Sequence, residues 1–540
     1  MPYHHLDLTR SAAQSDLAER LSALRTEFEL PAAFPPDVAR EAEQAAAAVG
    51  KDLPQTDRTD LPFLTIDPPG STDLDQAVHL QAGAEGHPDG FTVHYAIADV
   101  PAFITPGGAL DAETMRRGQT VYLPDGRVPL HTEVISEDAG SLLPGQDRGA
   151  YLWTFALDAA GAVVDTGLER ATVRSRTQLT YEQAQQMIDD GSVTEVPRLT
   201  LEEVTTLRLL KQVGLLRTEQ ESARGGASLN LPEQEIVATE DGYDLVSAPP
   251  LPVEGWNAQI SLMTGMAAAQ IMLEGKVGIL RTMPDADASS EARFRARTVA
   301  LGHPWEKGTP YGQYLRGLDT TDPQHLAIMH AATSLFRGAG YTAFDGELPE
   351  VTTQAAIAAP YAHTTAPLRR LVDRFVLQVC LALVEGREVP QELRERLGEL
   401  PEAMKSSGSV ASRVENAALD LIQTAELAGH EGERFSAVVV SAPTPEQVEK
   451  AQAEDRLPYG EVQLEDPPVL GRYEGHAEAG QAVTVELVSA DLESRKVLFR
   501  IVEQAAEEGH HGRPSRPDSG FQRSLGPARY SGHITDDRSH

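Results

Sequence analysis

The most informative segment of this 540-residue chain reads Thr65-Ile66-Asp67-Pro68-Pro69-Gly70-Ser71-Thr72-Asp73-Leu74-Asp75-Gln76. The apolar run that enters it, from Phe63, predicts a strand, and the segment 77–81 predicts the next strand. Three carboxylates therefore lie in one loop between two strands. The prolines and Gly70 let such a loop fold back, and in extended backbone Asp73 and Asp75 point the same way. We expect these two side chains to converge with that of Asp67.

Three converged carboxylates repel one another unless a hard cation lies among them. Magnesium favours carboxylates, water and phosphate oxygens, and two such ions ~3.5–4 Å apart can hold the attacking and leaving oxygens of a phosphodiester hydrolysis. A solvated turn is the alternative, because Asp, Gly, Pro and Ser are also turn residues. A calcium loop fits less well, since no glutamate follows at the EF-hand spacing. Spacing alone leaves the metal site and the turn open.

The charge balance restricts the class of partner. The chain has 46 basic and 81 acidic residues and a formal net charge of −35, which argues against loose, non-specific binding of nucleic acid. It does not exclude a narrow positive groove. Taken alone, the basic clusters are typical of solvated helix or strand faces; they are Arg116-Arg117, Arg170 with Arg174 and Arg176, and Arg369-Arg370 with Arg374.

Cysteine content and hydropathy indicate the cellular compartment. The single cysteine, Cys380, excludes an intramolecular disulfide and fits a reducing environment. It lies in the apolar run 376–384, which predicts a buried helix. No run approaches ~18 apolar residues, and the first residues do not resemble a secretory signal. We expect a cytoplasmic monomer without a membrane segment.

The chain divides into four segments, and the pattern predicts a multidomain α+β protein. Residues 1–60 contain two predicted helices, 12–27 and 36–49, in an arrangement that could be helix-turn-helix-like. Residues 61–430 predict a large mixed α/β domain. Residues 431–504 contain five short β-rich runs, at 434–441, 461–464, 469–473, 481–488 and 496–502, typical of a five-stranded OB-type barrel. The polar tail 505–540 is predicted to be disordered.

Several segments resemble the ribonuclease II / ribonuclease R (RNB) family. The stretch 65–77 resembles the family signature Thr-Ile-Asp-Pro, three spacers, Asp, one spacer, Asp-Asp-Ala. Further matches follow in the family's order and extend the resemblance over roughly residues 60–380: Ile97–Val100, Arg117–Pro124 with Pro129-Leu130, Ser141–Arg148, Leu179–Glu182 and Tyr361–Arg370. Each match is moderate by itself, but the ordered set is highly specific.

The resemblance implies an RNB-like catalytic domain. The implied activity is hydrolytic, processive, 3′-to-5′ degradation of single-stranded RNA to nucleoside 5′-monophosphates. Two magnesium ions would serve as cofactors, one of them arriving with the substrate, and manganese could substitute. A contact to RNA through the C-terminal barrel, which resembles the family's barrel of the ribosomal protein S-one type, is implied as well.

The resemblance also assigns site residues. Asp67, Asp73, Asp75 and Gln76 would hold the metal ions, and Asp73, Asp75 and Arg369 would be catalytic. Tyr181, Arg281, Arg369 and Arg370 would bind RNA. Two alternatives come from the residues themselves: Arg369 could form a helix-start salt bridge with Asp373, and Tyr181 could be an ordinary core or capping tyrosine.

Three positions depart from the family pattern. Gln76 stands where the family has a fourth aspartate, Gln259-Ile260 where it has a glutamate pair, and Ala417-Ala418-Leu419 where it has Ala-Glu-Arg. These departures keep a catalytically weak RNA-binding scaffold as the alternative function. A metal-dependent DNA nuclease or phosphatase is a third reading, because contacts to the ribose 2′-hydroxyl are not visible in a sequence.

The two ends of the chain carry further expectations. The family's N-terminal cold-shock barrels are expected to be absent, because the residues ahead of the aspartates look helical. A more open channel should then tolerate RNA with paired regions. In the C-terminal barrel, five side chains could face RNA or belong to the fold: Phe435, Arg472, Tyr473, Lys496 and Phe499.

Overall fold

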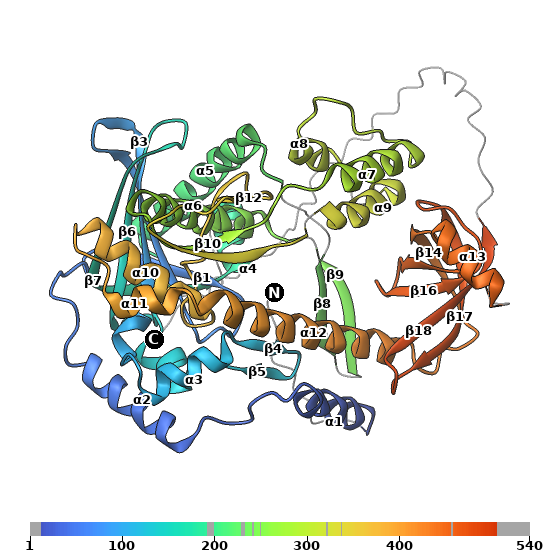
Figure 1. The fold of residues 1–540 in the computed structure, drawn as a ribbon, viewed down its shortest axis with the longest axis horizontal. Coiled ribbons are helices and arrows are strands. Elements are labelled where there is room, and N and C mark those ends of the chain that lie inside the picture. Colours follow the sequence, from blue (N-terminus) through green and yellow to red (C-terminus); the bar gives the residue numbers. More distant parts are fainter. Residues whose placement is uncertain are drawn as a thin grey trace, which may run out of the picture. The chain divides into compact units, whose positions relative to one another are not determined.

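The structure is a computed structural model, and it describes residues 12–504 except 192–198, 228–232, 240–241, 249, 320–321, 336 and 455–456. Figure 1 shows the order and arrangement of its elements. The tail predicted to be disordered, 505–540, lies outside the described residues. The predicted α+β class is confirmed: a large mixed α/β region precedes a C-terminal five-stranded barrel.

A closed barrel with the strand order β1-β2-β3-β6-β7 forms the centre of the mixed region. Strand β1 pairs with β7 in parallel, and the other pairs are antiparallel. Its interior is apolar and includes Tyr95, Trp153 and Phe155. The strands are β1 (Phe63–Asp67), β2 (Gln76–Ala84), β3 (His87–Ala98), β6 (Asp147–Leu157) and β7 (Val163–Thr180).

Helices cover this barrel and join its core. They are α4 (Tyr181–Asp190), α5 (Leu201–Arg224), α6 (Pro252–Gly275) and α10 (Leu371–Val384). Cys380 is fully buried in α10, as predicted. Helix α6 approaches the segment ahead of α10 closely, because a Cβ on Gly265 would lie 2.2 Å from the Tyr361 ring. This close approach fixes the segment 361–370 beside the barrel.

The N-terminal helices α1 (Ala12–Glu27) and α2 (Pro36–Val49) have the predicted bounds. Leucines of α1 pack against the hairpin of β4 (Val121–Leu123) and β5 (Gly126–Val128) and against α12 (Leu400–Leu427). Between residues 12 and 62 the structure contains these two helices and no strand.

The remaining elements of the mixed region are α3 (Ala109–Arg117), α7 (Ala288–Ala300), α8 (Tyr311–Arg316), α9 (Pro323–Ala332), α11 (Gln391–Leu397), and the strands β8 (Glu233–Thr239), β9 (Gly242–Ala248), β10 (Val277–Thr282), β11 (Gly340–Asp345), β12 (Thr353–Gln354) and β13 (Ala359–Pro360). No helix in the described part of the chain is long and apolar enough to cross a membrane.

The C-terminal barrel has the order β14-β15-β16-β18-β17 and is closed. It consists of β14 (Arg434–Ser441), β15 (Tyr459–Leu464), β16 (Leu470–Glu474), β17 (Ala482–Asp491) and β18 (Lys496–Gln504), with the unpredicted helix α13 (Pro445–Ala453) between the first two strands. The strand positions agree with the prediction to within three residues.

The aromatic side chains of this barrel form its core. Tyr473 and Phe499 are fully buried, and Phe435 packs edge-on against Phe499. Of the two alternatives left open for these two rings, the structure supports a place in the core of the barrel. A barrel this small needs large rings to fill its interior, and Gly471 makes room for one of them, since a Cβ there would lie 2.5 Å from Phe499. Arg472 and Lys496 are exposed.

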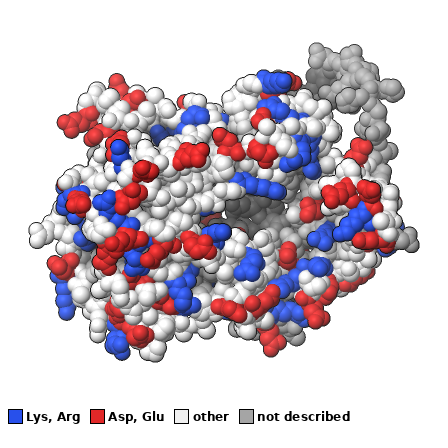
Figure 2. All heavy atoms as spheres, viewed as in Figure 1, with Lys and Arg blue, Asp and Glu red and all other residues white. Residues whose placement is uncertain are grey.

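The basic clusters are only partly solvated. Figure 2 shows acidic and basic side chains intermixed on the face in view. Arg117, however, is buried, donates to Glu113 at 2.8 Å and stacks on Phe34. Arg374 is also buried and pairs with Asp111 at 2.6 Å. For these two arginines the predicted solvated face was wrong: Arg117 pairs with Glu113 one helical turn away and packs against Phe34, and Arg374 pairs with a carboxylate distant in sequence.

Candidate active site

The loop between β1 and β2 brings the predicted carboxylates to the mouth of the first barrel. Asp67 ends β1, and Gln76 begins β2. Gly70 has a φ of +76°, and the Ser71 amide donates to the Pro68 carbonyl at 3.2 Å, so the chain turns back at this point. The Leu74 side chain is fully buried. Because side chains alternate along extended backbone, its neighbours Asp73 and Asp75 are directed to the other side.

A cavity of about 860 Å³ opens at this loop. Six of the predicted site residues line it, and they are Asp67, Asp73, Asp75, Gln76, Tyr181 and Arg369. The β4–β5 hairpin contributes Tyr122 and Arg127 to the lining of this cavity. The convergence predicted from the loop is thus present, and Arg369 is brought to it from a distant part of the sequence.

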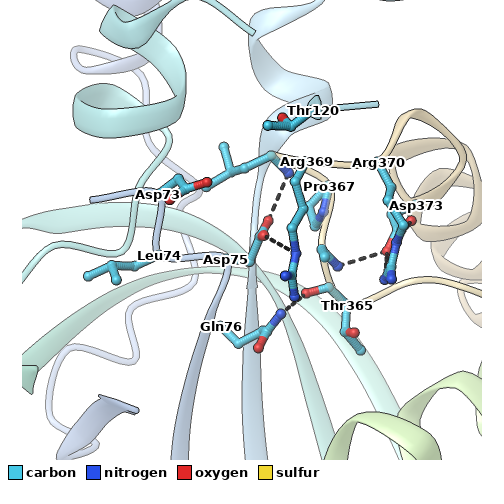
Figure 3. A network of polar contacts seen from close by, with 12 residues as sticks. Asp73, Leu74, Asp75, Gln76, Thr120, Thr365, Pro367, Arg369, Arg370 and Asp373 are labelled. Carbon is cyan, nitrogen blue, oxygen red and sulfur yellow. Dashed lines mark hydrogen bonds and ion pairs between the residues drawn. The ribbon is translucent and has the colours of Figure 1, made fainter. Parts of the chain in front are cut away.

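Asp75 is the carboxylate held by the segment ahead of α10 (Figure 3). Its Oδ1 accepts a hydrogen bond of 2.8 Å from the Leu368 amide, 293 residues away in sequence. Its Oδ2 lies 3.5 Å from Nε of Arg369. Burial raises the pKa of Asp75 well above its usual value, although Arg369 and the Leu368 N–H act in the opposite direction. A cation beside Asp75 would favour its ionised form.

The segment that carries Arg369 is anchored on both sides (Figure 3). The Gln76 side-chain amide donates to the Thr365 carbonyl at 2.5 Å, and the Thr120 amide donates to the Arg369 carbonyl at 3.0 Å. The salt bridge to Asp373, considered above for Arg369, is made by Arg370 at 2.8 Å. Arg369 is therefore left to face Asp75.

Asp73 has a partner that the sequence did not reveal. Its Oδ1 accepts a hydrogen bond of 2.6 Å from Arg127 on β5. The same guanidinium pairs with Glu137 at 2.5 Å and donates to Thr72 at 2.9 Å. The only available signal was position, since Arg127 lies between two segments that resemble the RNB family, Arg117–Pro124 and Pro129-Leu130.

Asp67 differs from Asp73 and Asp75 in the environment of one of its carboxylate oxygens. Its Oδ2 is buried and forms no hydrogen bond with the described residues. Burial raises the pKa of Asp67 to about 7, an effect that Arg369 partly offsets. Such an oxygen, next to carboxylate and amide oxygens, fits a hard divalent cation. In the described part of the chain no group of three His, Cys, Asp or Glu side chains is already arranged around a metal position. The donor types fit magnesium or manganese, and two of the aspartates are turned toward arginines.

Of the predicted RNA contacts other than Arg369, two line a cavity and one does not. Tyr181 is the first residue of α4, is half-buried and lies on the cavity wall. Arg370 lines a smaller cavity of about 270 Å³, which shares Arg369 with the large one. Arg281 stacks on Tyr341 and lines neither cavity. Base stacking by Tyr181 and RNA contacts by Arg281 stay predictions.

The position at which a sugar contact was expected to be altered is occupied within the fold. Gln259 on α6 is buried, and its amide donates to Glu221 on α5 at 2.5 Å. A glutamate at position 259 would bring two carboxylates together at this point. The neutral amide of Gln259 therefore suits this position, because it donates to the carboxylate of Glu221.

Comparison with known proteins identifies two family regions. The RNB domain matches residues 55–386, and the RNase II-type exonuclease C-terminal S1 domain matches residues 433–502. Ribonuclease R of Aquifex aeolicus is 24% identical over 507 residues, which are 88% of this chain and 69% of that protein.

Two further relatives match over a shorter region. The probable exosome complex exonuclease RRP44 of Caenorhabditis elegans is 26% identical over 357 residues, 63% of this chain and 36% of the relative. A protein of Arabidopsis thaliana named inactive exonuclease DIS3L2 is 30% identical over 356 residues, 62% of this chain and 33% of the relative. The chain thus spans about a third of the length of these two proteins.

Solved structures show the same fold. Mycoplasma genitalium RNase R in complex with ribose methylated single-stranded RNA superimposes with a TM-score of 0.77 at 18% identity, over 91% of this chain and 78% of that one. Its complex with double-stranded RNA gives 0.75 at 19% identity, over 91% and 84%. Yeast Ssd1, described as a pseudonuclease, gives 0.60 at 17% identity, over 79% and 51%.

Proposed function

We propose, from the premise that the chain belongs to the RNB-domain family, that it is a hydrolytic exoribonuclease that releases nucleoside 5′-monophosphates from the 3′ end of single-stranded RNA. The observation that carries the proposal is the position of Asp75, held between the Leu368 amide and Arg369 at the mouth of a cavity that Asp67 and Asp73 also line. The exoribonucleases among the relatives support the reaction class.

Members of this family that are exoribonucleases depend on a metal. When bound here, magnesium or manganese would activate a water molecule and polarise the phosphate, held by oxygens of Asp67, Asp73, Asp75 and Gln76. Asp75 orients the reacting groups, because its carboxylate is fixed by a backbone amide rather than by a mobile side chain. We infer that magnesium is the physiological ion and that two ions take part, one of them arriving with the RNA.

Arg369 is the residue that stabilises developing charge. Its guanidinium lies at the cavity wall with Nε directed to Asp75, so its other N–H groups can donate to the non-bridging oxygens of a phosphate. Such preorganised donors strengthen as negative charge builds up on those oxygens. Tyr181, on the wall near Asp67, presents a ring on which the terminal base can stack.

Single-stranded RNA is the proposed substrate. RNA with paired regions is included because the similar Mycoplasma genitalium RNase R forms a complex with double-stranded RNA. The exposed Arg472 and Lys496 on the C-terminal barrel would contact the phosphates. Processive degradation, action as a monomer and a cytoplasmic location belong to the same proposal.

A catalytically weak RNA-binding scaffold is the second candidate. Relatives described as inactive or as a pseudonuclease favour it, together with Gln76 at the fourth aspartate position. The third departure has a structural reason instead, since Ala418 is buried in the contact between α12 and α1 and a longer polar side chain would not fit there. The retained Asp67, Asp73, Asp75 and Arg369 favour an active enzyme.

The decisive experiment incubates the protein with 3′-tailed RNA and with DNA of the same sequence, with and without magnesium, and identifies the products. We expect mononucleotides from RNA alone. Asp75→Asn should lower the rate more than ~1000-fold, whereas Asp89→Asn, an exposed aspartate of β3, should not change it. RNA binding without nucleotide release would establish the scaffold, and release from DNA would indicate a nuclease of broader specificity.

A further inference from the structure

The three arginines that line the large cavity each face a carboxylate. Arg25 binds Asp125 through two hydrogen bonds of 2.7 and 2.9 Å. Arg369 faces Asp75. The third cavity arginine, Arg127, holds Asp73. Each arginine that lines the cavity thus has a carboxylate partner, and the partners differ in how completely they are engaged.

Arg127 engages Asp73 from a rigid element. It lies on β5 opposite Tyr122 of β4, and the hairpin is packed on α1 through the Arg25–Asp125 pair and a shared apolar cluster. The guanidinium also donates to Thr72, and its third partner, Glu137, accepts a hydrogen bond from Thr72 at 2.9 Å. The positive charge at Asp73 is therefore held in place by several contacts.

A guanidinium in this position competes with a metal ion for Asp73. Its Nη1 lies 2.6 Å from Oδ1, so a divalent cation bound to that oxygen would be placed within a few ångströms of a fixed like charge. Asp67 is different, because its buried Oδ2 has no hydrogen-bond partner among the described residues. The cavity therefore presents one carboxylate oxygen that needs a cation and one carboxylate that already has a counter-charge.

The charges nearest the aspartates agree with this division. Arg127 pairs with Asp73 and Arg369 pairs with Asp75, whereas one oxygen of Asp67 is left without a hydrogen-bond partner among the described residues. Gln76, being neutral, adds no further negative charge to the loop. The other carboxylates of the lining lie outside this loop.

We propose that Arg127 supplies at Asp73 the positive charge that a second divalent cation would otherwise supply, so that without RNA the cavity binds one divalent cation, at Asp67 beside Asp75. The inference rests on the proposed function only in treating the cavity as the metal centre. Arg127 would be a positioning residue, which acts on the substrate through the carboxylate that it holds.

Cation binding without RNA tests the proposal. Manganese is titrated into the metal-free full-length protein at moderate salt, which screens the surface carboxylates, and tightly bound Mn²⁺ is counted by the loss of the free-ion electron paramagnetic resonance signal. We expect one ion per wild-type chain and two for Arg127→Gln, because Asp73 then loses its counter-charge. Arg127→Lys should stay at one, and so should Arg25→Gln, whose arginine lines the same cavity but pairs with Asp125.

Two tightly bound ions in the wild type, or one ion in a folded Arg127→Gln variant, would overturn the proposal. If Arg127→Gln does not fold, as judged by circular dichroism, Asp67→Asn gives an independent answer. It should lose the single tight ion, and retention of that ion would contradict the proposal. Failure of the proposed function is distinguishable, since it would show as absent nucleotide release whatever the number of bound ions.

Discussion

The two closed barrels of this molecule have the same number of strands and different chemistry. In the first, the loop between β1 and β2 carries Asp67, Asp73 and Asp75, and segments from elsewhere in the chain cover it. In the second, the aromatic residues fill the interior, and charged residues such as Arg472 and Lys496 remain exposed. The difference teaches that a barrel supplies a frame, whereas the loops and what covers them determine reactivity.

Burial of charge is the physical distinction between the barrels. Asp75 is almost fully buried under the segment 364–370, next to the guanidinium of Arg369, and burial raises the pKa of Asp75. Burial also raises the pKa of Asp67, to about 7. Asp491, at the end of β17, is exposed and accepts hydrogen bonds from its own turn, which lower its pKa. A carboxylate of the first kind is stabilised in its ionised form by a neighbouring cation, whereas one of the second kind stabilises a turn.

Removing a ring from the second barrel should have the largest effect on stability. Phe499→Ala leaves a cavity in the core of the C-terminal barrel and should cost ~3–5 kcal/mol. Thermal unfolding should show an earlier transition, and RNA affinity should fall. Release of nucleotides from a short oligonucleotide should persist at saturating RNA. If that rate fell in proportion to stability, the two barrels would not be separable in function.

Removing Arg369, which lies at the mouth of the first barrel, should lower the catalytic rate and have less effect on stability. Arg369→Ala is expected to lower kcat about 100- to 1000-fold, because donors to the developing phosphate charge are lost. The matched change Arg472→Ala, at an exposed position of the second barrel, should weaken RNA binding and leave kcat unchanged. Steady-state kinetics on one RNA separate the two results. Equal losses of kcat would show that the comparison between the barrels is wrong.

Tyr181→Leu should have a smaller effect on RNA binding. The substitution keeps an apolar side chain against the core but removes the ring, and stacking contributes ~1–3 kcal/mol per base. We expect weaker RNA binding, measured by fluorescence anisotropy with a short 3′-labelled RNA, and recovery with Tyr181→Phe. Unchanged affinity in the leucine variant would assign Tyr181 to the core alone.

The first barrel should also be the more sensitive to mild acid. Burial, helped by His94 and Arg176, lowers the pKa of His79 to about 4 from its usual 6.5. The unfolded chain therefore binds a proton before the folded chain does, so stability present above pH ~6.5 is lost as the pH falls toward ~4. Chemical denaturation across this range should show a decline that His79→Gln reduces. An unchanged pH dependence in that variant would place the sensitivity at another group.

Much of the fold was readable in the sequence because it depends on local patterns. The N-terminal helices, the strands on either side of the aspartate loop and the five strands of the second barrel follow from hydrophobic periodicity and turn residues. The long strand β7 was missed because charged residues such as Arg170 and Arg174 interrupt its apolar pattern. One of them pairs with the buried Asp99, and the other with Asp147 of the neighbouring strand.

By itself the sequence determined that Asp67, Asp73 and Asp75 share a loop and that this loop resembles a nuclease centre. Only the tertiary structure decided which cation faces which carboxylate: Arg369 at Asp75, Arg127 at Asp73 and Arg370 at Asp373. The reason is that a loop conformation follows from its own prolines and glycines, whereas the ion pairs at Asp73 and Asp75 join residues tens to hundreds of positions apart. Their geometry depends on how β1, β5 and α10 pack, and no local pattern records that packing.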